Sequence, residues 1–230
     1  MNYDRYLNAR VAAVPPSGIR RFFDLAATMK DTISLGVGEP DFITPYHIRN
    51  AAINSIVDGE TQYTPNRGLL ALREEISGYL QKRYQITYDP QKEILVTVGA
   101  SESIDVALRA LISDGDEVLV PEPSYVSYSP SVIFAGGTPV GVETREDTDF
   151  RLSAQRVREA ITPRTKALIL PYPNNPTGAV MGREELEELA QVVRERELLV
   201  ISDEIYSELT YGGKHVSFAS LPGMWPYTLT

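Results

Sequence analysis

Residues 166–178 read Lys-Ala-Leu-Ile-Leu-Pro-Tyr-Pro-Asn-Asn-Pro-Thr-Gly, an apolar run that ends in a turn rich in proline and asparagine. A short, nearly continuous apolar run of this kind predicts a strand buried on both faces, as in parallel sheets. Similar runs occur at 94–98, 117–120 and 198–202, and a weaker one at 138–142.

Segments with helical periodicity lie between these runs. Apolar residues recur every three or four positions in 101–111 and in 186–193, with charged residues opposite them in the second segment. The alternation of strands and helices predicts right-handed crossovers and an α/β fold with a mostly parallel sheet flanked by helices. Before the first strand we predict three helices and a short strand, at 20–29, 45–57, 69–84 and 33–35.

The composition excludes several classes of protein. The chain has 230 residues, of which 43% are hydrophobic and 23% charged, so it can bury a core. Its net charge of -9 argues against a surface for nucleic acid or anionic membranes. The absence of cysteine excludes disulfides and thiolate metal sites, and His47 and His215 have no companion motif for a metal. Because we find no apolar span and no signal-peptide pattern, we expect a cytoplasmic protein.

Three polar segments directly follow predicted strands, at the sheet edge where ligands bind in such folds. The first, Gly99-Ala100-Ser101, opens a predicted helix. Its small residues could present backbone N–H groups to an anion at the helix N-terminus. Alternatively, Ser101 could simply cap the helix.

The other two segments follow the strands at 166–170 and 198–202. Asn175, in Asn-Pro-Thr-Gly at 175–178, could present its amide at the sheet edge, or the segment could be only a tight turn. The bond between Asn175 and Pro176 could be cis.

Asp203 ends a buried strand, where a carboxylate needs a partner to offset desolvation. A protonated ring nitrogen would be such a partner; alternatively, Asp203 is solvated and caps the next segment.

Together these segments resemble the class I/II aminotransferases, which are aspartate aminotransferase-like enzymes of fold type I that use pyridoxal 5'-phosphate. Five motifs occur in the family's order and spacing, and the resemblance covers essentially the whole chain. They are Gly-Val-Gly-Glu-Pro-Asp-Phe at 36–42, Tyr-Thr-Pro-Asn-Arg-Gly at 63–68, Pro-Ser-Tyr at 123–125, Asn-Pro-Thr-Gly at 175–178 and Asp-Glu-Ile-Tyr at 203–206. The resemblance implies transfer of an amino group between an amino acid and a 2-oxo acid.

The resemblance also implies how the chain would bind the cofactor ring. Asp203 would sit beside the pyridine nitrogen and keep it protonated, so that the ring acts as an electron sink. Asn175 and Tyr206 would hydrogen-bond the phenolic oxygen of the ring. Tyr125 would stack on the ring face.

Further roles follow from the same resemblance. Ala100 and Ser101 would receive the cofactor phosphate, and Gly38 would lie near the substrate carboxylate. Tyr63 would reach the phosphate of the neighbouring subunit's cofactor, which implies a homodimer. Without the resemblance, core packing or turn geometry would be the default interpretation of Gly38, Tyr63 and Tyr125.

In this family a lysine forms a Schiff base with the cofactor and moves the proton. The resemblance puts that lysine beyond Thr230. The lysines of the chain, none of which has the matching context, are Lys30, Lys82, Lys92, Lys166 and Lys214. Lys214 lies in Gly-Gly-Lys-His, which reads as an exposed turn. We therefore expect a large domain truncated before the cofactor lysine, with no residue for this catalytic step and no activity of the chain alone.

We expect residues 1–45 to form an N-terminal arm with part of a small domain, and residues 46–230 to form the N-terminal part of the large cofactor-binding domain. Two alternatives to transamination stay open. The chain could be a non-catalytic remnant or interaction module that binds pyridoxal phosphate non-covalently, or part of a related pyridoxal-phosphate lyase. The motifs serve chemistry that these enzymes share, and they do not identify the amino donor.

Overall fold

The computed structural model describes residues 3–16, 18, 22, 25, 28–29, 33, 38 and 42–230. The chain divides into two compact units, one made of Met1–Val14 with Leu70–Thr230 and the other of Pro15–Leu69. The second unit contains α3 (Tyr46–Val57), as predicted for 45–57. The division that we expected at residue 45 stays a prediction.

The larger unit contains the sheet and most of the described helices. Its α-helices are α1 (Ala9–Ala12), α4 (Leu70–Tyr84), α5 (Ala100–Leu111), α6 (Tyr128–Ala135), α7 (Ala154–Ala160) and α8 (Arg183–Arg196). Its strands are β1 (Glu117–Glu122), β2 (Thr138–Glu143), β3 (Thr165–Pro171), β4 (Leu199–Asp203) and β5 (Thr228–Leu229). Short 3-10 helices are η1 (Asp4–Tyr6), η2 (Glu146–Thr148), η3 (Ser207–Leu209), η4 (Phe218–Ser220) and η5 (Trp225–Tyr227).

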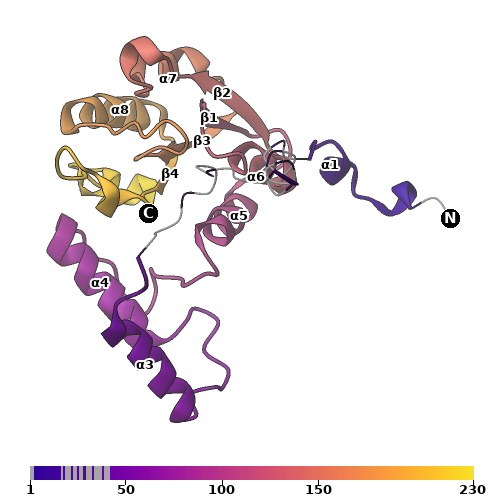
Figure 1. Cartoon of the computed structure of the whole chain (residues 1–230). Coiled ribbons are helices and arrows are strands. Elements are labelled where there is room, and N and C mark those ends of the chain that lie inside the picture. The colour runs from indigo at the N-terminus through magenta and orange to yellow at the C-terminus, as the bar shows by residue number, and fades with distance from the viewer. Residues whose placement is uncertain are drawn as a thin grey trace. The chain divides into compact units, whose positions relative to one another are not determined.

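The five strands form one parallel sheet in the order β2-β1-β3-β4-β5 (Figure 1). The four runs predicted at 117–120, 138–142, 166–170 and 198–202 are β1, β2, β3 and β4. Since α-helices connect β1 to β2, β2 to β3 and β3 to β4, the predicted α/β fold with a mostly parallel sheet is confirmed.

The strand predicted at 94–98 is wrong. This segment has no strand partner, and the sheet of the described chain ends at β2 and β5. Leu95 and Val98 are 50% and 91% exposed, although both are residues that favour buried strands. A strand needs a neighbour to pair its backbone N–H and C=O groups, so an apolar run alone does not make one. The helix and strand predicted at 20–29 and 33–35 fall mostly outside the described residues.

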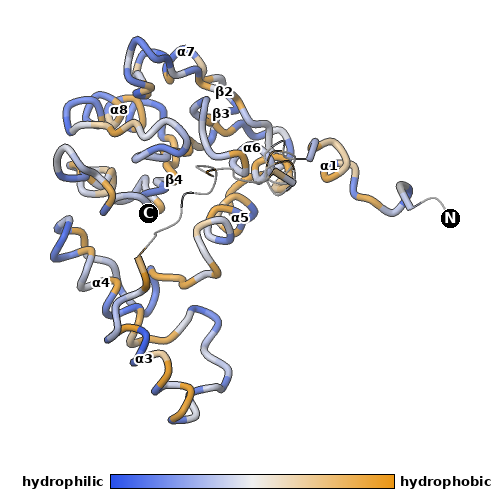
Figure 2. Tube along the Cα trace, in the orientation of Figure 1, coloured by the Kyte–Doolittle hydropathy of each residue, from blue (hydrophilic) through white to orange (hydrophobic). Residues whose placement is uncertain are grey.

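The core has two layers, one on each face of the sheet. Ala167 and Ile169 of β3 pack in one cluster with α5 and α6, while Leu168 and Leu170 pack in the other with α7 and α8. Successive strand residues point to opposite faces, so both faces are buried only if every residue of the strand is apolar. Figure 1 shows α7 and α8 on one side of the sheet and α5 and α6 on the other. Figure 2 shows hydrophilic and hydrophobic stretches alternating along α8, the pattern of a helix with one buried face.

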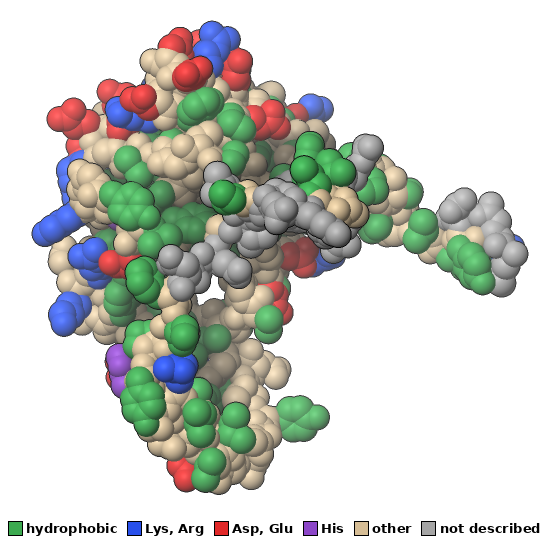
Figure 3. Space-filling view, viewed as in Figure 1, with side chains coloured by type: hydrophobic (Ala, Val, Ile, Leu, Met, Phe, Trp, Pro, Cys, Tyr) green, Lys and Arg blue, Asp and Glu red, His purple; other side chains and the backbone are tan. Residues whose placement is uncertain are grey.

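The surface carries charged residues of both signs. Figure 3 shows acidic and basic side chains intermixed near α7, where Arg156 pairs with Glu143 at 3.1 Å and Arg158 with Glu195 at 3.0 Å. These pairs are partly exposed, so each stabilises the fold only slightly. Within the described part of the chain, no helix has both the length and the apolarity needed to span a membrane.

Candidate cofactor site at the carboxyl ends of the strands

The residues predicted to contact the cofactor ring follow neighbouring parallel strands. Pro171, at the end of β3, lies in register with Asp203, at the end of β4. Tyr125 follows the end of β1, which pairs with β3, and Asn175 and Tyr206 follow β3 and β4. Because the carboxyl ends of parallel strands meet at one edge, the fold brings these four side chains to the same edge of the sheet.

The Asp203 carboxylate is fixed by two hydrogen bonds. The phenol of Tyr128, in the first turn of α6, donates to Oδ2 at 2.8 Å. The backbone N–H of Ile205 donates to Oδ1 at 3.2 Å. This local bond is the kind expected in the alternative interpretation, in which Asp203 caps the next segment. Asp203 is half-buried, so its carboxylate loses part of its hydration. The two hydrogen bonds supply part of the compensation that this loss requires.

Tyr128 is buried and stays a hydrogen-bond donor. Burial raises the pKa of Tyr128 well above its ordinary value, and the negative charge and hydrogen bond of Asp203 raise it further. Tyr206 also lies near enough to raise this pKa. The ring of Tyr125 meets that of Tyr128 edge to face, with centroids 5.6 Å apart, and Tyr125 keeps 38% of its surface exposed.

The turn after β3 uses one asparagine for structure and leaves the next one exposed. The buried Asn174 accepts hydrogen bonds through Oδ1 from the hydroxyl and the backbone N–H of Thr177, at 2.9 and 3.3 Å. Its backbone N–H donates to Ala179 O at 2.9 Å. Asn175 is exposed, its bond to Pro176 is cis, and no described hydrogen bond uses its amide. The tight turn is therefore confirmed, while the role of the Asn175 amide stays a prediction.

The N-terminus of α5 also lies at this edge. The C-terminal end of α5 leads directly into the start of β1, so its N-terminal end points toward the carboxyl ends of the strands. Gly99, not Ser101, occupies the cap position, with a φ of 82° that favours glycine. No described hydrogen bond takes the backbone N–H of Ala100 or Ser101 to a protein acceptor. This end can therefore offer free N–H groups to an anion.

Two predicted site residues lie elsewhere in the chain. Gly38 and Tyr63 belong to the second unit, and Tyr63 is fully exposed. Their expected roles, near a substrate carboxylate and at a neighbouring subunit's cofactor, stay predictions.

Among the described residues, no hydrogen bond or ion pair joins a lysine to Asp203. Lys166 lies at the opposite, amino-terminal end of the sheet, where Nζ is 3.0 Å from Asp116 Oδ2. Lys82, Lys92 and Lys214 are exposed, as expected for Lys214. Among the described residues, no group of histidine, aspartate and glutamate side chains could hold a metal ion.

Sequence reasoning missed Tyr128, the residue that binds Asp203. The sequence does contain a signal that Tyr125 and Tyr128 could be in contact. They are three positions apart, and side chains at this spacing are neighbours on the surface of a helical turn. That spacing could suggest the ring contact, but only the fold brings Tyr128 to Asp203, 75 positions along the chain.

The model of the protein family described as aminotransferase class I and II matches residues 30–228. The chain belongs to this family. The class I and II aminotransferases that it resembles include an aspartate aminotransferase from Pyrococcus abyssi, 49% identical over 97% of this chain. Aromatic-amino-acid aminotransferase 2 from Thermococcus litoralis is 46% identical, also over 97% of this chain.

The fold agrees with the same family. A solved structure titled Pyrococcus protein-A1 superposes with a TM-score of 0.93 at 49% identity, over 95% of this chain. The chain spans 58% of the length of each of the two aminotransferases and 57% of the solved chain. The sequence interpretation of the chain as an aminotransferase-like domain is thus confirmed.

Proposed function

We propose that this chain forms the cofactor-binding part of a pyridoxal-phosphate-dependent aminotransferase. The enzyme would transfer an amino group between an amino acid and a 2-oxo acid. The observation that supports this most directly is the half-buried carboxylate of Asp203, held by Tyr128 at the carboxyl end of β4. Sheet folds of this kind bind ligands at that edge, and family membership favours this ligand.

The chemical groups at the edge fit the cofactor. Asp203 offers a carboxylate to a protonated ring nitrogen, and its bond to Tyr128 leaves Oδ2 with a second lone pair. Asn175 and Tyr206 offer donors for the phenolic oxygen, and Tyr125 offers an exposed ring for stacking.

The phosphate would bind at the N-terminus of α5. The backbone N–H groups of Ala100 and Ser101 would donate to its oxygens, and the positive end of the helix dipole would favour its charge.

The chemistry that the cofactor supplies, when bound, is to draw electron density from the Cα atom of the amino acid into its protonated ring. The contribution of Asp203 would be to hold that proton on the ring nitrogen through its negative charge. Tyr128 would hold the carboxylate in one orientation, and the stacked Tyr125 would keep water from one face of the ring. Gly38 would line the site for the substrate carboxylate.

Two further parts of the proposal concern assembly and catalysis. Tyr63 would bind the phosphate in a neighbouring subunit, so the enzyme would be a homodimer. Because no described lysine is bonded to Asp203 and no lysine of the chain has the sequence context of the family's Schiff-base lysine, we propose that these 230 residues bind the cofactor non-covalently and do not transfer amino groups by themselves. The amino donor stays open.

Titration of the chain with pyridoxal 5'-phosphate, followed by protein fluorescence, tests the proposal. We expect saturable binding, weakened about tenfold or more by Asp203→Asn, because a charge-assisted hydrogen bond is worth about 1.5–3 kcal/mol. The matched control is Asp116→Asn, at the opposite end of the sheet, which should leave the affinity unchanged. Absence of binding by the wild type, or equal affinity of Asp203→Asn, would contradict the proposal.

Borohydride reduction of the same complex separates non-covalent from covalent binding. We expect no single lysine to retain the cofactor after reduction and peptide mapping. Labelling of one lysine at equal stoichiometry would show that the chain carries its own Schiff-base residue.

A further inference from the structure

A second carboxylate is buried directly after Asp203. The side chains of Glu204 and His215 are 8% and 9% exposed, and Oε2 of Glu204 lies 2.8 Å from Nε2 of His215. Because a carboxylate only accepts, the imidazole donates from Nε2. A buried charge of this kind is costly to the fold unless it is fully hydrogen-bonded.

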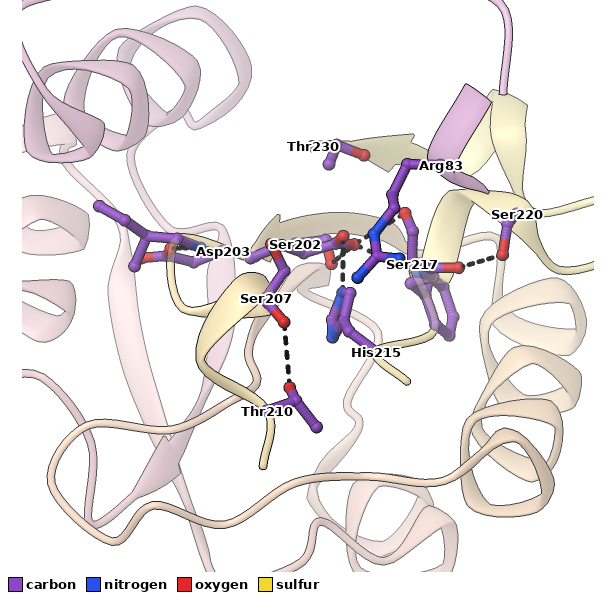
Figure 4. A network of polar contacts seen from close by, with 12 residues as sticks. Arg83, Ser202, Asp203, Ser207, Thr210, His215, Ser217, Ser220 and Thr230 are labelled. Carbon is purple, nitrogen blue, oxygen red and sulfur yellow. Dashed lines mark hydrogen bonds and ion pairs between the residues drawn. The ribbon is translucent and has the colours of Figure 1, made fainter. Parts of the chain in front are cut away.

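The other carboxylate oxygen accepts three more hydrogen bonds. Oε1 of Glu204 accepts from Ser202 Oγ at 2.8 Å, from Ser217 Oγ at 3.0 Å and from the backbone N–H of Phe218 at 3.2 Å. In Figure 4 the labelled Ser202, His215 and Ser217 gather around one point, and Asp203 lies apart from them. The network thus ties the end of β4 to the segment that leads into η4.

The end of β4 is therefore held from two sides. Successive side chains of a strand point to opposite sides, so Ser202 and Asp203, the last two residues of β4, face different ways. Glu204 follows the strand and accepts from Ser202 Oγ, so its carboxylate lies on the side of Ser202. Tyr128 binds Asp203 from α6, while His215 and Ser217 bind Glu204 from the segment before η4. Because Asp203 and Glu204 share a peptide bond, a change in the backbone at Glu204 would reorient the Asp203 carboxylate.

The helix α4 completes this arrangement. The ring of Tyr84 packs edge to face against His215, with centroids 5.7 Å apart. Tyr79 and Arg83 bind Glu208 in η3, at 2.6 and 2.9 Å. The segment that carries Tyr206 is thus fixed on both sides, at positions 204 and 208, and Asp203 directly precedes it.

We propose that Glu204 and His215 are positioning residues for the cofactor site. Their bond fixes the backbone of residues 203–206, and so sets the orientation of the Asp203 carboxylate and of the Tyr206 phenol. Neither residue touches the cofactor. This inference rests on the proposed function, since the oriented groups are the ones that would bind pyridoxal phosphate.

The test compares two buried carboxylates of the same sheet. Glu117 has a side chain only 4% exposed and accepts from Thr162 Oγ1 at 2.5 Å and from Arg164 Nε at 2.9 Å, but it starts β1 at the opposite edge. We expect Glu204→Gln and Glu117→Gln to lower the midpoint of urea unfolding alike. Only Glu204→Gln should weaken pyridoxal phosphate binding, by about tenfold.

A second pair of variants keeps the test decisive if Glu204→Gln fails to fold. His215→Gln keeps an N–H donor, whereas His215→Leu removes it. We expect His215→Gln to bind the cofactor more tightly than His215→Leu.

The inference is overturned if Glu204→Gln loses no more affinity than Glu117→Gln, or if the two His215 variants bind equally while the wild type binds. A wild type that does not bind would instead overturn the proposed function itself, and this inference with it.

Discussion

The phenol of Tyr128 donates a 2.8 Å hydrogen bond to Oδ2 of Asp203 and so joins the first turn of α6 to the last residue of β4. The carboxylate that we propose for the cofactor ring nitrogen is thereby oriented before any ligand arrives. Preorganisation of this kind lowers the entropic cost of binding, because the side chain is already ordered.

Replacing Tyr128 with phenylalanine should weaken pyridoxal phosphate binding several-fold and lower the free energy of unfolding by about 1.5–3 kcal/mol, the range for a hydrogen bond to a charged group. Titration and urea unfolding would measure both quantities. Tyr172→Phe is the matched control, since the buried Tyr172 donates to the Phe150 carbonyl at 3.0 Å within the other core cluster. The Tyr172→Phe variant should lower stability without changing the affinity for pyridoxal phosphate. An equal loss of affinity in both variants would contradict the role of Tyr128 in orienting Asp203.

The two adjacent asparagines after β3 should respond differently to alanine. Asn174→Ala removes the buried acceptor of two bonds from Thr177, and should destabilise the fold by about 1–3 kcal/mol. Asn175→Ala removes an exposed amide, and should leave stability within about 0.5 kcal/mol but weaken cofactor binding. Unfolding and titration of both variants give the comparison. If Asn175→Ala bound as well as the wild type, its amide would have no part in the site.

Two leucines test which apolar runs form strands. Leu168, in β3, is fully buried, so Leu168→Ala should cost about 2–5 kcal/mol of unfolding free energy. Leu95 is half exposed in the segment without a strand partner, so Leu95→Ala should cost less than about 0.5 kcal/mol. Urea unfolding of the 230-residue chain measures both. A large loss in Leu95→Ala would show that the Leu95 side chain is packed after all.

Stability should fall in alkaline solution. Burial raises the pKa values of Tyr128 and Tyr172 well above their ordinary value of 10.0. Below about pH 10 the two phenols are protonated in both the folded and the unfolded chain. Above about pH 10 the phenols of the unfolded chain release protons that those of the folded chain keep. The free energy of unfolding should therefore decrease as the pH rises above about 10, as measured by urea unfolding at stepwise pH. The Tyr128→Phe, Tyr172→Phe double variant should show a shallower decrease; an unchanged slope would assign the effect to other groups.

The sequence by itself determined most of the sheet and the family. The runs at 117–120, 166–170 and 198–202 became strands because a strand covered by helices on both faces must be apolar at every position. The same rule placed Asn175 and Asp203 at strand ends, since an apolar run that stops in a polar turn leaves the sheet there.

Only the tertiary structure decided which neighbours these segments have. Residues 94–98 have the composition of a strand, but they form none because no described strand lies beside them. His215 stands in a stretch that reads as an exposed turn, yet its side chain is buried against Glu204. Tyr128 and Asp203 are far apart in sequence, and no local pattern predicts their bond. The physical reason is common to all three: propensity and hydrophobic pattern act within a few residues, whereas strand pairing and the burial of a charge depend on which distant groups the fold brings into contact.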